Sequence, residues 1–308
     1  MVWVKRGLVF DPSIQAPWIF SHAQVPTAFE MDEHIRVFFA GRNNQGRSFI
    51  TYVDLDKVDP TKIIYVHDKP ILPLGETGTF DDEGMMPSDL IKIQDRIYFF
   101  YSGWNRRMTC PYHNATGILF SDDNGASYYR PFDGPILDRI STEPYLAVTP
   151  SVLVENGIWK MWYVSGLSWK EIDGYFEPIY VIKYAHSLDG INWIRPSHVC
   201  IEQHHALEAF SRPSVIKDVD TYKMWFCSRN SINYRGGEGS YSLGYAESSD
   251  GVNWVRTDGE LDLKADSSEW DGEMQCYPYI IDIADKRYMF YNGNGFGRSG
   301  FGLAEWLK

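Results

Sequence analysis

The sequence predicts an all-β fold in which five similar units close into one ring over residues 1–308. Three observations lead to this prediction. They are a long internal repeat, short apolar and aromatic runs of strand length within each repeat, and tight-turn dipeptides between the runs. No segment has the periodicity of an amphipathic helix. Together these features are typical of a five-bladed β-propeller, which we expect to form a single domain.

The repeat is clearest at its prolines. Each unit has a proline, an apolar run, a short polar turn and an aromatic run, such as Met-Trp-Tyr at positions 161–163. A unit of this kind cannot bury both faces of its own sheet, so we expect each unit to pack against its neighbours. The prolines are 61, 63, 63 and 65 residues apart, at Pro26, Pro87, Pro150, Pro213 and Pro278.

Two further runs complete most units. A third apolar run follows the aromatic one at residues 49–54, 117–121, 181–187, 243–248 and 301–306. In three units a turn dipeptide then leads to a fourth run: Asn124-Gly125, Asp189-Gly190 and Asp250-Gly251. These dipeptides supply the positive φ angles of tight hairpins. Four short strands joined by hairpins make a propeller blade.

The fifth unit has no fourth run after residues 301–306. In other units the fourth run begins with an aromatic, an aliphatic and a basic residue, as in Trp193-Ile194-Arg195. The segment Trp3-Val4-Lys5 has the same pattern. We therefore predict that residues 3–10 form the outermost strand of the last blade and cover an otherwise open sheet edge.

Composition narrows the classes of function. The net charge is -12 and the pI is about 5.1, with no basic face, which argues against nucleic acid or an anionic membrane as a partner. No apolar run has the length of a membrane span or the form of a signal peptide. Cys110, Cys200, Cys227 and Cys276 lack metal-type spacing, so we expect free thiols in the reducing cytoplasm and no metal.

Polar residues gather just before each proline and at the ends of the aromatic runs, positions that face the channel of a propeller. Amides, carboxylates and guanidinium groups bind hydroxyls, and tryptophan stacks on a sugar face, so this set suits a polyhydroxylated ligand. The predicted substrate-binding residues are His22, Gln24, Arg42, Trp104, Arg106, Arg212, Arg229 and Asn294.

Acidic residues near the same prolines are candidates for catalysis, because glycoside hydrolysis needs an acid and a second carboxylate. They are Asp82, Glu83, Glu208 and Glu273. We expect Glu83, Glu208, Arg212 and Glu273 to face one cavity on the axis, where like-charge repulsion would raise the pKa of one acid. In the alternative interpretation these acids form structural salt bridges with Arg212, Arg42 or Arg106.

The five repeats, the proline-initiated inner strand and the aromatic second strand resemble glycoside hydrolase families 43, 32 and 68 and the family 130 mannoside phosphorylases. They most closely resemble the glycosidase-like propellers of bacterial polysaccharide gene clusters. The resemblance covers essentially the whole chain and implies the fold. In family 43 an Asp directly before the first-blade proline acts as the base. The residues in that slot here are Val25, Met86, Thr149, Arg212 and Tyr277, none of them acidic.

The leading hypothesis is a carbohydrate-active enzyme that cleaves or transfers a glycosidic linkage in the central funnel, using carboxylates and no organic cofactor. Its partner is then an oligosaccharide or sugar conjugate. Two alternatives stay open. One is a sugar-binding propeller without catalysis, because the first-blade Asp is missing. The other is a phosphate-dependent glycoside phosphorylase, favoured by the arginines near the funnel.

Overall fold

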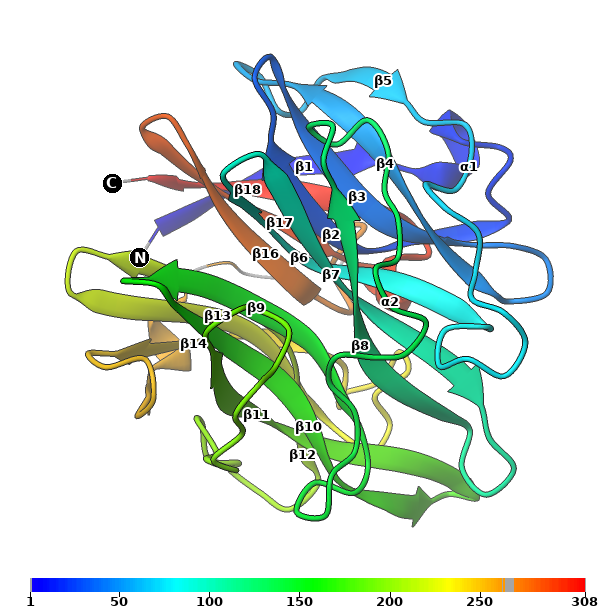
Figure 1. The fold of residues 1–308 in the computed structure, drawn as a ribbon, viewed down its shortest axis with the longest axis vertical. Coiled ribbons are helices and arrows are strands. Elements are labelled where there is room, and N and C mark those ends of the chain that lie inside the picture. The colour runs from blue at the N-terminus through cyan, green and yellow to red at the C-terminus, as the bar shows by residue number, and fades with distance from the viewer. Residues whose placement is uncertain (1, 262, 264–268, 308) are drawn as a thin grey trace.

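A computed structural model describes residues 2–261, 263 and 269–307 of the chain. The structure is almost entirely β, with two short helices, α1 (Pro12–Gln15) and α2 (Asn294–Gly297), and one 3-10 turn at Asp258–Glu260. The colours of Figure 1 follow one another around the molecule, and the first and last strands lie side by side near the two termini. None of the described helices is long and apolar enough to cross a membrane.

The described strands form three hydrogen-bonded sheets of four, ten and four strands. Within the ten-stranded sheet, the parallel pairs Ser48–Gly84 and Ala115–Ala147 join three antiparallel groups, so antiparallel pairing gives five sets in all. Set one holds β2 (Ser21–Glu30), β3 (His34–Arg42), β4 (Ser48–Asp56) and β5 (Ile63–Val66). Set two holds β6 (Gly84–Ile93), β7 (Arg96–Arg106) and β8 (Tyr112–Ser121), and set three holds β9 (Ala147–Glu155), β10 (Ile158–Ile172) and β11 (Tyr175–Ser187). Set four holds β12 (Glu208–Asp218), β13 (Thr221–Asn230), β14 (Ser242–Ser248) and β15 (Val255–Arg256). Set five holds β16 (Cys276–Ile283), β17 (Lys286–Asn292), β18 (Phe301–Leu307) and β1 (Val2–Phe10).

The predicted pairing of the N-terminal segment with the last set is confirmed. β1 pairs antiparallel with β18, and Trp3 lies opposite Trp306. Trp3 is buried, and its ring lies 5.9 Å from the ring of Trp225 in set four. The first strand therefore completes the last sheet and also packs against the set that precedes it.

Five clusters of buried apolar side chains lie between neighbouring sets. They join set one to set two, two to three, three to four, four to five, and five back to one. The aromatic runs of the second strands supply many of these side chains, including Phe39, Phe99, Trp162, Trp225 and Phe290. Each sheet is apolar on both faces because each face contacts another sheet.

Polar side chains link the inner strands of neighbouring sets. The hydroxyl of Ser151 accepts a hydrogen bond from the amide of Val215, at 3.0 Å, and the hydroxyl of Ser214 accepts one from the amide of Ile280, at 2.8 Å. These serines directly follow Pro150 and Pro213. The recurrent Pro-Ser pair thus satisfies buried amides across the gap between sheets.

The residue before four of the five repeat prolines has a left-handed backbone. The φ angles are 59° at Val25, 46° at Thr149, 51° at Arg212 and 55° at Tyr277. The strand register shifts at each of these prolines, which marks a bulge. A bulge re-aims the side chain at its extra residue, so these positions differ in direction from the rest of the strand.

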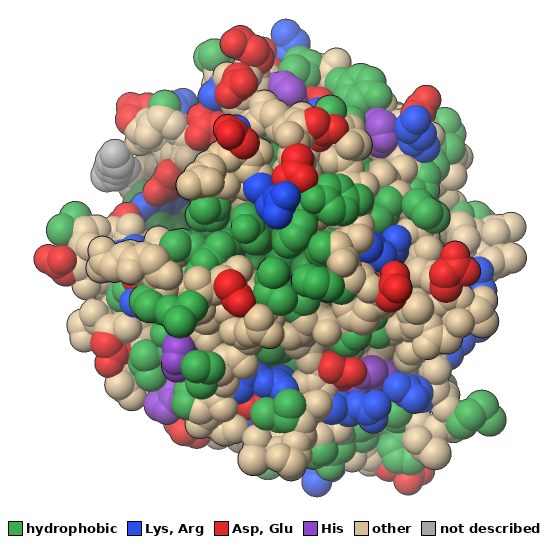
Figure 2. Space-filling view, viewed as in Figure 1, with side chains coloured by type: hydrophobic (Ala, Val, Ile, Leu, Met, Phe, Trp, Pro, Cys, Tyr) green, Lys and Arg blue, Asp and Glu red, His purple; other side chains and the backbone are tan. Residues whose placement is uncertain are grey.

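The four cysteines are free thiols, as the sequence predicts. On the face shown in Figure 2, hydrophobic side chains gather at the centre and acidic and basic side chains surround them. The charged groups thus lie mainly toward the rim of this face.

Candidate functional site

A cavity of about 380 Å³ lies where the inner strands converge. We call it the funnel cavity. Four of the five residues that precede the repeat prolines line it: Val25, Met86, Thr149 and Tyr277. The other lining residues are Gln24, Arg42, Gly46, Trp104, Tyr112, Asn114, Leu146, Val148, Val164, Tyr180 and Ser211. Residues from sets one, two, three, four and five therefore contribute to one site.

Arg42, at the end of β3, is the Lys or Arg side chain among the described lining residues of the funnel cavity. Its Nε and Nη2 atoms donate hydrogen bonds to Oε1 of Gln24, at 3.0 and 2.7 Å. Gln24 is neutral, so it orients the guanidinium without compensating its charge. Burial lowers the pKa of Arg42, and the charge of Arg298 lowers it further, although Tyr277 opposes this. A partly buried guanidinium in this setting favours an anionic ligand group.

His22 lies beside Arg42 but does not line the cavity. Burial, together with the charges of Arg42 and Arg298, lowers its pKa to about 4. The imidazole is therefore neutral at neutral pH. Its Nδ1 atom is 2.8 Å from the hydroxyl of Ser21.

Aromatic and amide side chains form much of the remaining wall. Trp104 is held by a 2.7 Å hydrogen bond from its Nε1 atom to the hydroxyl of Ser48. Tyr112 and Asn114 come from the start of β8. Within the described residues, Oδ1 of Asn114 and Oγ1 of Thr149 are buried without a hydrogen-bond partner. The wall thus has aromatic rings that can stack on a sugar ring and oxygen atoms that can accept hydrogen bonds from sugar hydroxyls.

Arg229 lies behind this wall and supports the tyrosines. Its Nε atom donates to the hydroxyl of Tyr241 at 3.2 Å, and its guanidinium stacks 3.8 Å from the ring centre of Tyr234. Tyr241 in turn shares a 2.6 Å hydrogen bond with Tyr180, which lines the cavity. Arg229 therefore holds a wall residue in place, and it is not itself among the lining residues.

Arg212 is fully buried and joins three sets of strands. Its Nη1 atom donates to the carbonyl of Pro87 at 3.0 Å. Its Nη2 atom donates to the hydroxyl of Thr27 at 2.8 Å and to the carbonyl of Pro26 at 3.3 Å. Burial lowers the pKa of Arg212 to about 10, so the side chain stays charged at neutral pH. Its contacts are those of a structural tie between β12, β2 and β6.

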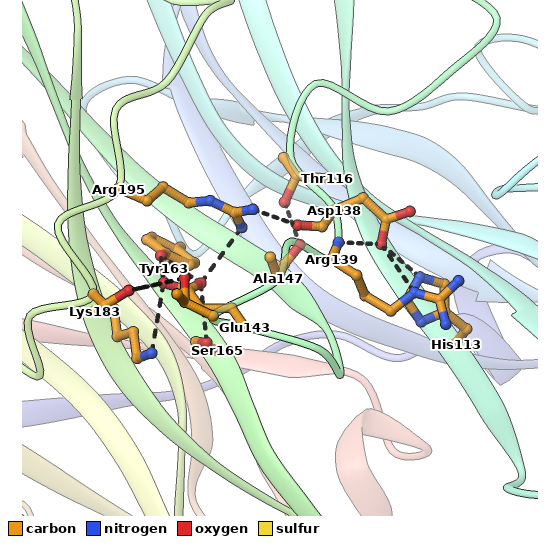
Figure 3. A network of polar contacts seen from close by, with 12 residues as sticks. His113, Thr116, Asp138, Arg139, Glu143, Ala147, Tyr163, Ser165, Lys183 and Arg195 are labelled. Carbon is orange, nitrogen blue, oxygen red and sulfur yellow. Dashed lines mark hydrogen bonds and ion pairs between the residues drawn. The ribbon is translucent and has the colours of Figure 1, made fainter.

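An acid–base pair recurs in four of the sets. A carboxylate at or just before the start of the inner strand meets a basic residue from the outermost run, in the pairs Asp81–Arg130, Glu143–Arg195, Glu208–Arg256 and Asp271–Lys5. The N–O distances, in the same order, are 2.9, 3.4, 2.9 and 2.7 Å. Figure 3 shows the third-set example, with Glu143 between Arg195, Tyr163, Ser165 and Lys183. We call this pair the sheet clamp, because it ties the first strand of a sheet to its last.

Glu208, predicted as catalytic, belongs to this clamp. Burial alone would raise the pKa of Glu208, but hydrogen bonds from Arg256 and from the amide of His204 lower it. The clamp is therefore charged at neutral pH. Its contribution to stability is lost as the pH falls below the usual range of a glutamate, because the unfolded state then binds the proton more readily.

The other predicted acids lie outside the funnel cavity as well. Glu83 sits between Arg47 and Arg106, at 3.2 and 3.1 Å. Asp82 accepts a 2.7 Å hydrogen bond from the amide of Gly78. Glu273 is exposed. Among the described lining residues there is no Asp or Glu.

The structure thus does not bring Glu83, Glu208, Arg212 and Glu273 into one cavity, contrary to the expectation from sequence. The reason is that Glu83 and Glu208 form ion pairs with nearby arginines. For Glu83 and Arg106 this is the salt bridge of the alternative interpretation. Of the predicted binding residues, only Gln24, Arg42 and Trp104 line the cavity. His22, Arg106, Arg212, Arg229 and Asn294 do not line it. A catalytic role for the acids stays a prediction.

Sequence reasoning missed several wall residues, above all Tyr112, Asn114 and Tyr180. They start or lie within third strands, β8 and β11, whose contribution to the channel has no local sequence mark. Thr149 and Tyr277 had such a mark, because they occupy the slot before a repeat proline. Neither residue is acidic, so the slot alone predicts no catalytic role for them.

Replacing Glu208 and Glu273 separately by Gln distinguishes the clamp from a catalytic pair. We expect Glu208→Gln to lower the free energy of unfolding by about 1–3 kcal/mol, because it removes one of the two carboxylates that pair with the largely buried Arg256, the other being Asp258. We expect the exposed Glu273→Gln to change it by less than about 0.5 kcal/mol. Urea unfolding measures both. Equal, small effects would show that the Glu208–Arg256 pair does not stabilise the sheet.

Comparison with known proteins identifies the class first. No family model matches the chain. A solved structure of an RGII complex of BT0996 superimposes with a TM-score of 0.77 at 17% identity, covering 99% of this chain and 92% of that one. A thermostable family-43 glycoside hydrolase gives 0.66 at 14% identity, covering 94% and 91%. The protein has the fold of a glycosidase-like β-propeller.

Two relatives then define the family. The proteins named "Uncharacterized protein MT1551" and "Uncharacterized protein Rv1502", from two strains of Mycobacterium tuberculosis, are each 36% identical over 308 residues. The match covers 99% of this chain and 99% of each relative. This protein belongs to the same family as these mycobacterial proteins.

Proposed function

We propose that residues 1–308 form one five-bladed propeller whose funnel cavity binds an acidic carbohydrate. The five interface clusters, which lead from each set to the next and back to the first, support the blade count and the single domain. The carbohydrate class is supported by the combination of tryptophan, tyrosine, amide and hydroxyl groups around one cavity.

The observation that carries this proposal is Arg42. It lines the cavity, its guanidinium is held by a neutral partner, and the charge of Arg298 acts on the same region. His22 adds no charge at neutral pH because its pKa is about 4. The site is therefore set up to receive a negative group, such as the carboxylate or phosphate of a sugar derivative.

We propose ligand binding, and not hydrolysis, as the function of the funnel cavity. A glycosidase needs two carboxylates about 5 to 9.5 Å apart across the scissile bond. The described wall of the funnel cavity supplies rings, amides, hydroxyls and a guanidinium instead. Cleavage by the predicted acids would rely on Glu83, whose backbone amide donates a hydrogen bond to the carbonyl of Trp104, a residue that lines the cavity.

The free thiols support a cytoplasmic location for the protein.

Phosphorolysis is the second candidate, and the uncompensated charge of Arg42 favours it. Inorganic phosphate in the funnel cavity would meet Arg42 and the field of Arg298. The two candidates predict different effects of inorganic phosphate. Phosphate competes with an acidic ligand if the cavity only binds. If the protein is a phosphorylase, phosphate is consumed as the glycoside is cleaved, and a sugar phosphate forms.

The replacement Arg42→Gln tests the proposal. We expect it to weaken binding of acidic oligosaccharides at least about tenfold, which corresponds to ~1.4 kcal/mol, because a charge-assisted hydrogen bond is lost. Isothermal titration calorimetry against acidic and matching neutral oligosaccharides measures this. The matched control is Arg96→Gln, an exposed arginine paired with Asp122. Unchanged affinity in Arg42→Gln, or equal affinity for neutral chains, would contradict the proposal.

A further inference from the structure

A second hollow adjoins the funnel cavity. It has a volume of about 310 Å³ and shares two wall residues with the funnel cavity, Tyr112 and Leu146. We call it the side pocket. The two hollows are therefore neighbours, with Tyr112 and Leu146 belonging to the walls of both.

An extended hairpin forms the outer wall of the side pocket. β10 and β11 continue to pair from Ser168 to Ile172, beyond the last pair that β10 makes with β9, at Ser165. The extension carries Trp169 and Phe176, which both line the pocket. The ring of Trp169 meets the edge of Tyr112, with ring centres 5.1 Å apart. Trp169 and Tyr112 thus form adjoining aromatic parts of the side-pocket wall.

This hairpin exposes apolar surface that its own sheet does not cover. Phe176 is 44% exposed and Tyr175 is 69% exposed. Exposed aromatic groups gathered at a concave site mark a binding surface more often than a structural one. A flat aromatic side chain can stack on the apolar face of a sugar ring.

The polar wall of the side pocket is basic. Arg107, Arg139 and His113 line it. Asp138 accepts from His113 at 2.7 Å and lies 3.9 Å from Arg139, so its charge is already engaged (Figure 3). Arg107 is exposed, and none of the ion pairs among the described residues includes it. The pocket therefore combines stacking faces with two arginines that a neutral sugar would not use.

We infer that the side pocket binds a second, negatively charged sugar unit of the same oligosaccharide that occupies the funnel cavity. The inference rests on the proposed function, since it assigns the next unit of the ligand proposed there. The ligand is then an acidic oligosaccharide of two or more units. Trp169 and Phe176 stack on the second unit, while Arg107 and Arg139 bind its anionic group.

The test is an array of oligosaccharides of one to four units, each present in a uronic acid form and a matching neutral form. We expect the wild type to bind acidic oligosaccharides of two or more units and to bind single units more weakly. Trp169→Ala, Phe176→Ala and the double variant Arg107→Gln/Arg139→Gln should each weaken binding of the longer acidic oligosaccharides about tenfold, ~1.4 kcal/mol. Binding of single units should not change.

The controls separate this inference from the proposed function. Phe132→Ala removes a phenyl ring of similar exposure, 43%, that lines neither pocket, and should leave binding intact. If single units bind as tightly as longer oligosaccharides, or if the side-pocket variants bind normally while Arg42→Gln does not, the side pocket is not a subsite although the funnel still binds. If the wild type binds no oligosaccharide, the proposed function fails and this inference fails with it. A melting curve for each variant identifies misfolding, and the exposed arginine variants decide the matter if Trp169→Ala does not fold.

Discussion

Deletion of residues 1–10 is expected to lower the free energy of unfolding of the whole protein by at least about 3 kcal/mol, the cost of losing one large buried aromatic side chain. The deletion removes β1, which covers the edge of β18, and with it Trp3, which is 4% exposed. It also removes Lys5, whose amine lies 2.7 Å from the buried carboxylate of Asp271. The exposed edge of β18 should in addition promote aggregation. Thermal and urea unfolding, followed by circular dichroism, measure the effect.

Point variants within β1 provide the control for this deletion. Trp3→Ala should reproduce a large part of the loss, whereas Leu8→Ala should cost far less because Leu8 is 39% exposed. Both changes keep the length of the strand and its backbone pairing. A truncated protein that unfolds at the wild-type midpoint would show that β1 contributes only to its own local order.

Replacement of Arg212 by Met is expected to cost about 3 to 5 kcal/mol of stability. Arg212 is completely buried, and its loss leaves the carbonyls of Pro26 and Pro87 and the hydroxyl of Thr27 without their donor. Arg212→Lys should fall between Met and the wild type, because one ammonium group keeps the charge but cannot reach across the same three acceptors. Urea unfolding gives the differences.

The surface variant Arg96→Met is the matched control for Arg212→Met. Arg96 makes an exposed ion pair with Asp122, so its loss should change stability far less than the loss of Arg212. If Arg212→Met were as stable as Arg96→Met, the buried arginine would not be a structural tie. A ligand contact would then be the better account of its position.

Much of the fold could be predicted from the sequence because its cues are local and repeated. The aromatic–aliphatic–basic pattern at Trp3-Val4-Lys5 identified the strand that pairs with β18. The site could be predicted less well. Glu208 is paired with a basic residue of its own sheet, Arg256, and such a pairing depends on tertiary geometry that spacing alone does not give. The basic residue of the fourth run was visible in the sequence, but its acidic partner was not.

The backbone conformation of the residue before each repeat proline could not be predicted from the sequence either. The sequence located Thr149 and Tyr277 there, yet nothing in the sequence indicated a left-handed backbone at a β-branched or aromatic residue. That conformation follows from the bulge in each inner strand, which is fixed by pairing with the second strand. The side chains that line the cavity are thus chosen by sheet geometry and not by local preference.

At these left-handed residues, the substitutions that would raise thermal stability differ from those that would change ligand preference. Val25 and Thr149 hold φ angles of 59° and 46°, which cost on the order of 1–3 kcal/mol each for such side chains. Glycine would relieve this strain but would remove a side chain that lines the cavity. A search for more heat-resistant variants would therefore tend to select substitutions that empty the site. Exchanging one side chain for another at these positions offers the opposite route, since it alters what the cavity accepts while the bulge and its strand pairing stay in place.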